Sequence, residues 1–160
     1  MDDFLFQSEA VDVFSMYANS ASGVVPQLDA SHNHDGGPRR ILVLEDDSVQ
    51  RYLLRQQLDS VGLQSIPAET LQEAWQLLQE GPIHLAILDM QLPDGCGLDL
   101  CRRIDEDNRL MGLPMLVLSS STRADVIRQT RAAGACYFIS KPYDPNVLLA
   151  RIEQVLGNSL

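Results

Sequence analysis

The chain has 160 residues, of which 45% are hydrophobic and 21% are charged, and its formal net charge is -10 at pH 7. This length corresponds to one ordinary domain with some chain to spare, and the hydrophobic content is sufficient for a buried core. The acidic balance argues against nucleic acid and against an anionic membrane as the main partner, because both of these surfaces are themselves negatively charged.

Residues 1–38 are predicted to form an N-terminal extension. The segment contains acidic residues but no Lys or Arg, and residues 20–38 are rich in Ser, Asn, Gly and Pro, which is typical of a flexible linker. Before that linker, Ala10, Val13, Phe14 and Tyr17 stand at helical spacing. We favour a disordered tail for this part. The alternative is a short amphipathic helix that docks on the domain or on a partner.

Several features of the sequence favour a cytoplasmic protein. The longest apolar runs, such as residues 41–44 and 85–88, are too short to span a bilayer. A secretory signal would require a Lys or Arg near the N-terminus, and none precedes Arg39. The cysteines Cys96, Cys101 and Cys136 are odd in number and lack metal-ligand spacing. We interpret them as small packing residues in a reducing compartment.

From Arg40 onward, short apolar runs alternate with helical patterns. The runs predict strands over residues 41–44, 63–66, 85–88, 115–118 and 136–139. Five helices are predicted. They span residues 49–61, begin after the N-cap Thr70, pass through residues 98–104, span residues 123–133 and begin after Asp144-Pro145. A loop containing Pro93, Gly95 and Gly97 precedes the third helix. This alternation predicts an α/β fold over residues 39–160, with one parallel sheet covered by helices on both faces.

Polar residues follow every predicted strand except the second. They are Glu45, Asp46 and Asp47 after the first strand, Asp89 after the third, Ser119, Ser120 and Ser121 after the fourth, and Ser140 and Lys141 after the fifth. The carboxyl ends of parallel strands meet at one edge, where ligands bind. Clustered carboxylates repel one another unless a hard cation such as Mg²⁺ lies among them. The pattern therefore predicts an acidic metal pocket with a phosphorylatable aspartate, whose phosphoryl oxygens contact Lys141 and Ser119.

Four motifs carry a resemblance to a known family. They are Ile-Leu-Val-Leu-Glu-Asp-Asp at residues 41–47, Leu-Asp-Met-Gln-Leu-Pro-Asp-Gly at 88–95, Val-Leu-Ser-Ser at 117–120 and Ile-Ser-Lys-Pro at 139–142. In this order and spacing they resemble the CheY-like receiver domains of two-component response regulators, over residues 39–157. The resemblance implies a flavodoxin-like (βα)5 three-layer sandwich with strand order 2-1-3-4-5. The type implied is a single-domain receiver with an N-terminal extension.

The resemblance also implies roles for particular residues. Asp89 corresponds to the phospho-acceptor and Lys141 to the phosphate-binding lysine, which is joined to Pro142 by a cis peptide. The implied cofactor is Mg²⁺, with Mn²⁺ as an alternative, and its implied ligands are Asp46, Asp89, Glu45 through water, and the backbone carbonyl of Gln91. Ser119 and Phe138 stand at the switch positions, and Gln91 and Ser121 at the positions that tune the lifetime of the acyl phosphate.

The function implied by the resemblance is that of a phospho-acceptor switch rather than an enzyme. A partner histidine kinase or phosphotransfer protein would phosphorylate Asp89. Signalling would follow through protein contacts of the fourth helix, fifth strand and fifth helix, a face that also offers a route to a homodimer. Because no output domain follows Leu160 in this sequence, we expect signalling through protein contact or onward phosphotransfer.

The same residues are compatible with simpler and competing interpretations. Asp47 lies one residue beyond the usual acidic pair, and we interpret it as a helix N-cap. Taken alone, Asp89 is compatible with a loop cap and Lys141 with a surface lysine. A receiver-like binding module that is never phosphorylated is the main alternative function, but it would need a damaged pocket. A phosphatase with an aspartate nucleophile would need a second Asp where this chain has Gln91.

Overall fold

The computed structural model describes residues 37–157, so the predicted N-terminal extension falls almost entirely outside the described residues. Within them, a five-stranded parallel sheet is built from β1 (Arg40–Leu44), β2 (Gln64–Ala68), β3 (Leu85–Asp89), β6 (Met115–Ser119) and β7 (Tyr137–Ser140). The strands are ordered β2-β1-β3-β6-β7, which confirms the predicted 2-1-3-4-5 order. The order reverses between β1 and β3, and ligands bind beside such a point in open parallel sheets.

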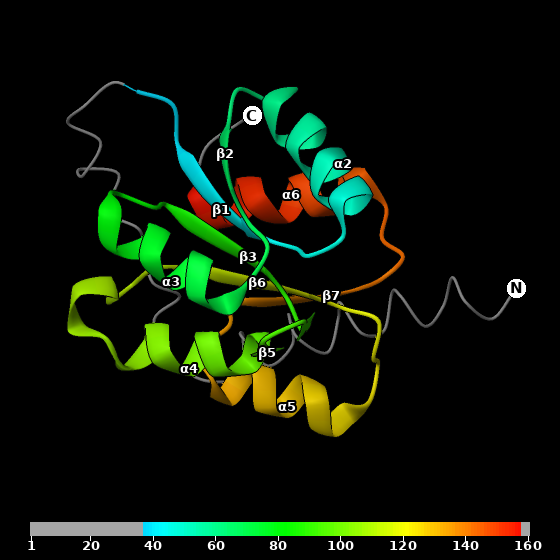
Figure 1. The fold of residues 1–160 in the computed structure, drawn as a ribbon. Coiled ribbons are helices and arrows are strands. Elements are labelled where there is room, and N and C mark those ends of the chain that lie inside the picture. The colour runs from blue at the N-terminus through cyan, green and yellow to red at the C-terminus, as the bar shows by residue number, and fades with distance from the viewer. Residues whose placement is uncertain (1–36, 158–160) are drawn as a thin grey trace, which may run out of the picture.

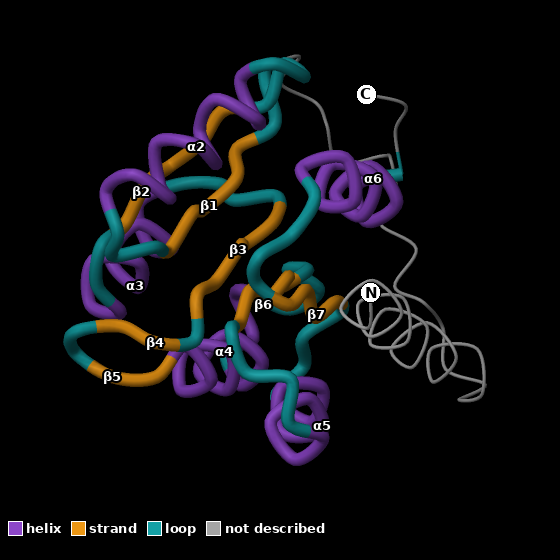
Figure 2. Tube along the Cα trace, turned by 90° about the vertical axis from the view of Figure 1, so that its right-hand side faces the viewer, coloured by secondary structure: helices purple, strands orange, loops and turns teal. Residues whose placement is uncertain are grey.

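Helices cover both faces of the sheet. The helices α2 (Ser48–Asp59) and α6 (Pro145–Leu156) lie on one face, and α3 (Leu71–Glu80), α4 (Gly97–Glu106) and α5 (Ala124–Ala132) lie on the other (Figure 1). The view turned by 90° shows the same division into three layers (Figure 2). This arrangement confirms the predicted flavodoxin-like sandwich. Among the described residues, no helix is long and apolar enough to cross a membrane.

Side-chain alternation along the strands explains why continuous apolar runs suit this fold. Successive residues of a strand point to opposite faces of the sheet. Ile41 and Val43 of β1 belong to the core cluster that includes Leu54 and Leu58 of α2. Leu42 and Leu44 belong to the second cluster, with residues of α3 and α4. Since both faces are covered, the central strands are apolar and buried along their interior positions, and polar residues stand only at their ends.

The ends of two helices match their sequence signals. The Thr70 hydroxyl accepts a hydrogen bond from the backbone N–H of Glu73 at 3.1 Å, which caps α3 as predicted. The carboxylate of Asp144 accepts from the backbone N–H of Asn146 at 2.8 Å, and Pro145 occupies the first turn of α6. These caps satisfy N–H groups that have no partner within the helix.

The second strand differs from its predicted position. The prediction placed it at residues 63–66, whereas β2 spans Gln64–Ala68. Leu63 is buried, but its N–H donates to the carbonyl of Leu58 at 3.1 Å, so it closes the turn after α2 instead of opening the strand. Pro67 lies inside β2 although proline has no backbone N–H. The sheet tolerates it because β2 is an edge strand, and no further strand needs a hydrogen bond from this position.

The segment after β3 was predicted to be a loop and contains a short antiparallel pair. The strands β4 (Gln91–Leu92) and β5 (Gly95–Cys96) are joined by a two-residue turn, and Gln91 pairs with Cys96. Gly97 then begins α4 against the end of β3. A Cβ atom at this position would collide with the carbonyl oxygen of Asp89, so the close approach requires glycine. A 3-10 helix, η2 (Asn108–Leu110), follows α4 and was also not predicted.

Candidate functional site

Three acidic side chains converge at the carboxyl edge of the sheet. Glu45 and Asp46 follow β1, and Asp89 ends β3, the strand that pairs with β1. One carboxylate oxygen from each residue lies within 4.8 Å of the others. Glu45 is 1% exposed and Asp89 is 8% exposed, whereas Asp46 is open to solvent. The parallel register therefore brings together the acids that the sequence had placed at the ends of separate strands.

Lys141, which follows β7, reaches across the sheet to the same cluster. Its Nζ donates to Oε2 of Glu45 at 2.7 Å and forms a longer ion pair with Oδ1 of Asp89 at 3.4 Å. The backbone N–H of Lys141 donates to the carbonyl of Ser119 at 2.7 Å, which continues the pairing of β7 with β6 beyond the strand end. The peptide between Lys141 and Pro142 is cis, as the resemblance implied.

The electrostatics of the cluster favour a cation. Burial raises the pKa of the Glu45 carboxyl above its ordinary value; the Lys141 hydrogen bond opposes this rise and the charge of Asp89 adds to it. Burial also raises the pKa of Tyr143 to about 12, with a smaller contribution from the charge of Glu45. The ionised form of Glu45 is thus disfavoured by burial and by repulsion from Asp89, and added positive charge would relieve both effects.

An open groove of about 960 Å³ runs along this edge and exposes part of the cluster. Its lining comes from the β1–α2 connection and α2, from the end of β3 with β4 and the β4–β5 turn, from the β6–α5 connection, and from the β7–α6 connection with the start of α6. The lining residues are Glu45, Asp46, Asp47, Gln50, Leu53, Gln57, Asp89, Gln91, Leu92, Pro93, Ser120, Lys141, Pro142, Tyr143 and Pro145. The acids are therefore accessible from one side, and apolar groups of α2 and the β7–α6 loop flank the opening.

Of the remaining residues predicted for the site, some line the groove and others are buried. Of the three serines after β6, Ser120 lines the groove, whereas Ser119 is 3% exposed and its Oγ accepts from the backbone N–H of Ser121 at 3.1 Å. Gln91 lines the groove, and its N–H approaches Oδ1 of Asp89 at 3.5 Å. Phe138 is 2% exposed and packs inward in the core. The functional roles assigned to these residues stay predictions.

Asp47 has the capping role that was predicted for it. Its carboxylate accepts from the backbone N–H of Gln50 at 2.8 Å, at the start of α2. Its own N–H donates to Oε1 of Glu45 at 3.2 Å, so the cap also holds an acid of the cluster.

Sequence reasoning missed several residues that support the cluster. Arg51 donates to the carbonyl oxygens of Glu45 at 2.8 Å and Asp46 at 3.2 Å, and pairs with Glu69 at 2.7 Å. Asp94 accepts from two backbone N–H groups at the start of α3, at 2.9 and 3.2 Å, which lowers its pKa and ties the β4–β5 turn to that helix. Glu69 directly follows β2, so the ending of the second strand was the signal that could have revealed it.

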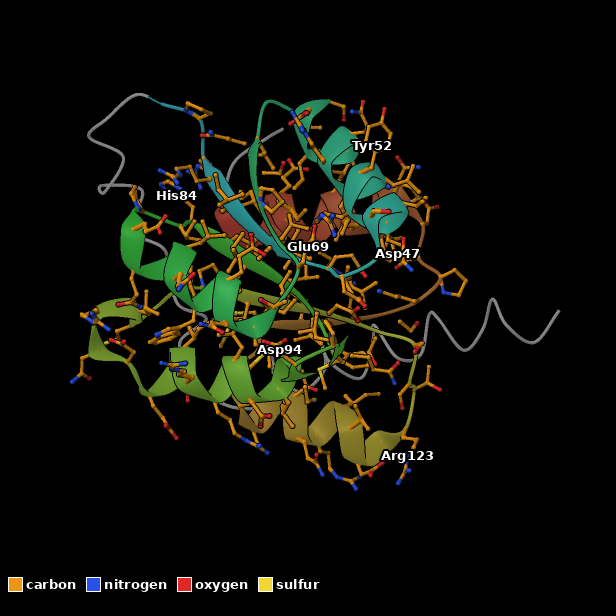
Figure 3. All side chains as sticks on the ribbon, viewed as in Figure 1. Asp47, Tyr52, Glu69, His84, Asp94 and Arg123 are labelled. Atoms are coloured by element: carbon orange, nitrogen blue, oxygen red, sulfur yellow. The ribbon has the colours of Figure 1, made fainter. Side chains whose placement is uncertain are left out.

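The opposite edge of the sheet is built differently. The Nδ1 atom of His84 accepts from the backbone N–H of Arg40 at 2.9 Å, and the N–H of His84 donates to the carbonyl of Arg40 at 2.8 Å. Burial and the nearby charge of Arg39 lower the pKa of His84. Figure 3 shows Asp47 and His84 at opposite ends of the sheet. At the amino edge the His84 imidazole pairs with backbone and completes the strand ladder, whereas the buried Nε of Arg40 has no hydrogen-bond partner among the described residues.

Comparison with known proteins agrees with this fold and this edge. A family model described as the response regulator receiver domain matches residues 41–153. The chain therefore belongs to the receiver domains of two-component systems. Members of this family are generally phospho-acceptor switches that bind Mg²⁺ and interact with histidine kinases or phosphotransfer proteins.

Individual relatives support the assignment at different lengths. The chain is 32% identical over 123 residues to the chemotaxis protein CheY1 of Helicobacter pylori, an alignment that covers 75% of this chain and 98% of CheY1. It is 30% identical over 118 residues to the phosphate regulon regulator PhoB of Pseudomonas aeruginosa, covering 74% of this chain. The alignment covers only 52% of PhoB, so this chain spans about half of that relative.

Solved structures agree with these relatives. A putative response regulator from Chloroflexus aurantiacus superimposes with a TM-score of 0.72 at 26% identity, covering 76% of this chain and 99% of that one. The non-phosphorylated HemR receiver domain from Leptospira biflexa has a TM-score of 0.69 at 32% identity, covering 76% and 97%.

Proposed function

We propose that this receiver accepts a phosphoryl group on Asp89 from a phosphohistidine of a partner kinase or phosphotransfer protein, in a Mg²⁺-dependent reaction. One observation carries the proposal. Asp89 lies where the oxygens of two further carboxylates fall within 4.8 Å, and the Lys141 ammonium lies 3.4 Å from its Oδ1. A nucleophilic carboxylate beside a cation site and a fixed ammonium is what transfer of a charged phosphoryl group requires.

The transfer step involves one bond formed and one broken. An oxygen of the Asp89 carboxylate forms a bond to phosphorus while the phosphorus–nitrogen bond of the donor phosphohistidine breaks. The electron pair of that bond stays on the donor imidazole. Lys141 supplies positive charge beside the oxygens of the transferred group, where stabilisation of developing charge is most effective. The groove leaves Asp89 open to the donor on one side.

The donor atoms of the cluster fit Mg²⁺, which prefers oxygen ligands and is usually held by one or two carboxylates together with a phosphate. Asp46 and Asp89 would hold the ion directly, Glu45 through water, and the backbone carbonyl of Gln91 would complete the protein ligands. When bound, the ion neutralises the acids and the incoming phosphoryl oxygens; Mn²⁺ would serve in the same way.

The donor protein is expected to contact the exposed side of α2. Val49 is 64% exposed, Tyr52 is 59% exposed and Leu53 is 50% exposed, and Leu53 also lines the groove above the acids. Tyr52 points away from the sheet (Figure 3). A phosphohistidine that reaches Asp89 must bring its own protein over this rim, where exposed apolar side chains favour a protein contact.

The response to phosphorylation is assigned to the β6–α5 loop and to Phe138. The phosphoryl group would attract the Ser119 hydroxyl, which in this structure accepts a bond from the Ser121 backbone. Rearrangement of that loop would change the packing of Phe138 and with it the face made by α5, β7 and α6. A target protein, or a second copy of the chain, would read that face. Gln91 and Ser121 would tune how long the phosphoryl group survives.

Acetyl phosphate with Mg²⁺ provides a direct test. Intact-mass measurement should show the gain of one phosphoryl group on the wild-type chain and no gain on Asp89→Ala. Chelation of Mg²⁺ should prevent the gain. Equal phosphorylation of wild type and Asp89→Ala would refute the assignment, and no gain on either chain would favour a binding module that does not use phosphate.

A further inference from the structure

Gln50 adopts an arrangement that the local sequence does not suggest. It stands three residues after the N-cap Asp47, and in a capping box the side chain at this position bonds the N–H of the cap residue. Here the N–H of Asp47 donates to Glu45 instead, at 3.2 Å. The Oε1 atom of Gln50 accepts from Nζ of Lys141 at 2.9 Å. The side chain that would ordinarily cap the helix therefore holds the lysine of the cluster.

Four hydrogen bonds close a ring through this contact. Lys141 donates to Oε2 of Glu45 at 2.7 Å and to Gln50 at 2.9 Å. The backbone N–H of Gln50 donates to Asp47 at 2.8 Å, and the N–H of Asp47 donates to Oε1 of Glu45 at 3.2 Å. The ring joins the end of β1, the start of α2 and the end of β7. The position of the ammonium is thereby fixed relative to the loop that contains the acids.

The ring determines where the remaining lysine hydrogen points. An ammonium has three N–H groups, and two of them are directed at Glu45 and Gln50. Asp89 is the next acceptor, with Oδ1 at 3.4 Å from Nζ. A lysine side chain has a flexible stem and is not oriented by its own geometry. With two N–H groups held by these fixed acceptors, the third is available to Asp89.

We propose that Gln50 is a positioning residue that orients Lys141 toward the phosphoryl group on Asp89, an inference that rests on the proposed function. Glu45 alone does not provide this orientation throughout the reaction, because its carboxylate is also assigned to the metal. Gln50 stands outside the acidic cluster and its amide is neutral, so it continues to hold the lysine when Glu45 is engaged. The effect on Asp89 is indirect and passes through the lysine.

The test uses an isosteric variant. Gln50→Met keeps the length of the side chain and removes the acceptor. At saturating Mg²⁺ and acetyl phosphate it should lower the rate constant for phosphorylation about fivefold, the effect of losing one modest hydrogen bond. The Kd for Mg²⁺ should stay within about twofold, since the residue is no metal ligand.

Two controls separate this role from a structural one. Gln57 lies on the same helix and lines the same groove, and its Oε1 has no hydrogen-bond partner among the described residues. Gln57→Met should therefore leave the rate constant for phosphorylation unchanged. In a Lys141→Met background, Gln50→Met should cause no further loss, because the residue acts through the lysine.

The possible outcomes are distinguishable. A Gln50→Met chain that reacts at the wild-type rate, or that loses the same factor without Lys141, overturns the positioning role alone. A loss of Mg²⁺ affinity that fully accounts for the slower rate overturns it as well. A wild-type chain that never gains a phosphoryl group overturns the proposed function, and this inference with it.

Discussion

The two ends of the sheet use charged and polar residues in opposite ways. At the amino edge, His84 and Arg40 exchange hydrogen bonds with each other across neighbouring strand starts, and this pairing completes the ladder. At the carboxyl edge, Glu45 and Asp89 are buried beside each other with Lys141 as their shared partner. The amino edge uses these polar groups to complete the strand ladder, and the carboxyl edge keeps an excess of negative charge.

This difference supports the carboxyl edge as the proposed ligand site. Both edges have polar side chains, so polarity alone does not distinguish them. What distinguishes the carboxyl edge is an excess of negative charge, since three acids lie together and the one lysine pairs with only two of them, Glu45 and Asp89. Such an arrangement has a cost in the free protein that a bound cation removes. The following changes should therefore affect the two edges differently.

Replacing Lys141 by Met should have the largest effect on stability. Glu45 would remain buried without its ion-pair partner, which should lower the free energy of unfolding by about 3 kcal/mol at pH 7.5 without Mg²⁺. Because burial already raises the pKa of Glu45, acidification protonates this carboxyl and should reduce the loss. Urea unfolding at several pH values would measure both effects. A loss that is independent of pH would contradict the assignment to Glu45.

Magnesium should stabilise the protein through the carboxyl edge alone. At a concentration one hundred times its Kd, the ion should raise the free energy of unfolding by about 2.7 kcal/mol, whereas KCl at the same ionic strength should not. Asp46→Asn should reduce this stabilisation by Mg²⁺, and His84→Ala at the amino edge should retain it in full. An equal gain in Asp46→Asn and wild type would place the cation elsewhere.

Introducing a methyl group at Gly97 should disturb the position of Asp89. The new Cβ would collide with the Asp89 carbonyl, so Gly97→Ala should cost about 2 kcal/mol and slow phosphorylation as well. Gly62→Ala is the control, because a Cβ there meets nothing within 4 Å and its cost comes from the positive φ of 78°. Slower phosphorylation in both variants would point to a general loss of stability.

His84 should give the smallest effect, and the only one that depends on histidine titration. Its pKa is lowered by folding from the ordinary 6.5, so its stabilising contribution is present above pH 6.5 and is lost as the pH falls through the lowered value. His84→Ala should cost about 1 kcal/mol at pH 7.5. His84→Asn offers an acceptor that does not titrate, and should lose less stability than wild type between pH 7.5 and pH 5. Identical pH profiles would contradict this role.

The sequence contained enough information to predict the fold and the composition of the acidic cluster. The strands around Leu42, Ile87 and Val117 are buried on both faces, so their apolar runs follow directly from the architecture. Once those strands are parallel and in order, the positions of Glu45, Asp89 and Lys141 follow from chain direction alone. The site could thus be predicted because it depends on backbone topology more than on side-chain conformation.

The features that escaped prediction depend on where individual side chains point. Asp47 caps α2 as predicted, but nothing in the sequence indicated that the Gln50 amide accepts from Lys141. Arg51 is a helical residue whose partners come from the β1–α2 loop and from Glu69 after the edge strand. The start of β2 was misplaced because Leu63 is apolar for packing reasons within the preceding turn.

Location of the acyl phosphate is the most direct test of the central claim. Borohydride reduction of the phosphorylated chain converts the modified aspartate to homoserine, and peptide mass mapping then identifies its position. The account predicts homoserine at position 89 in wild type, with none at position 46 or 47. Homoserine at either of those neighbouring acids, or its persistence in Asp89→Ala, would contradict the assignment of Asp89 as the acceptor.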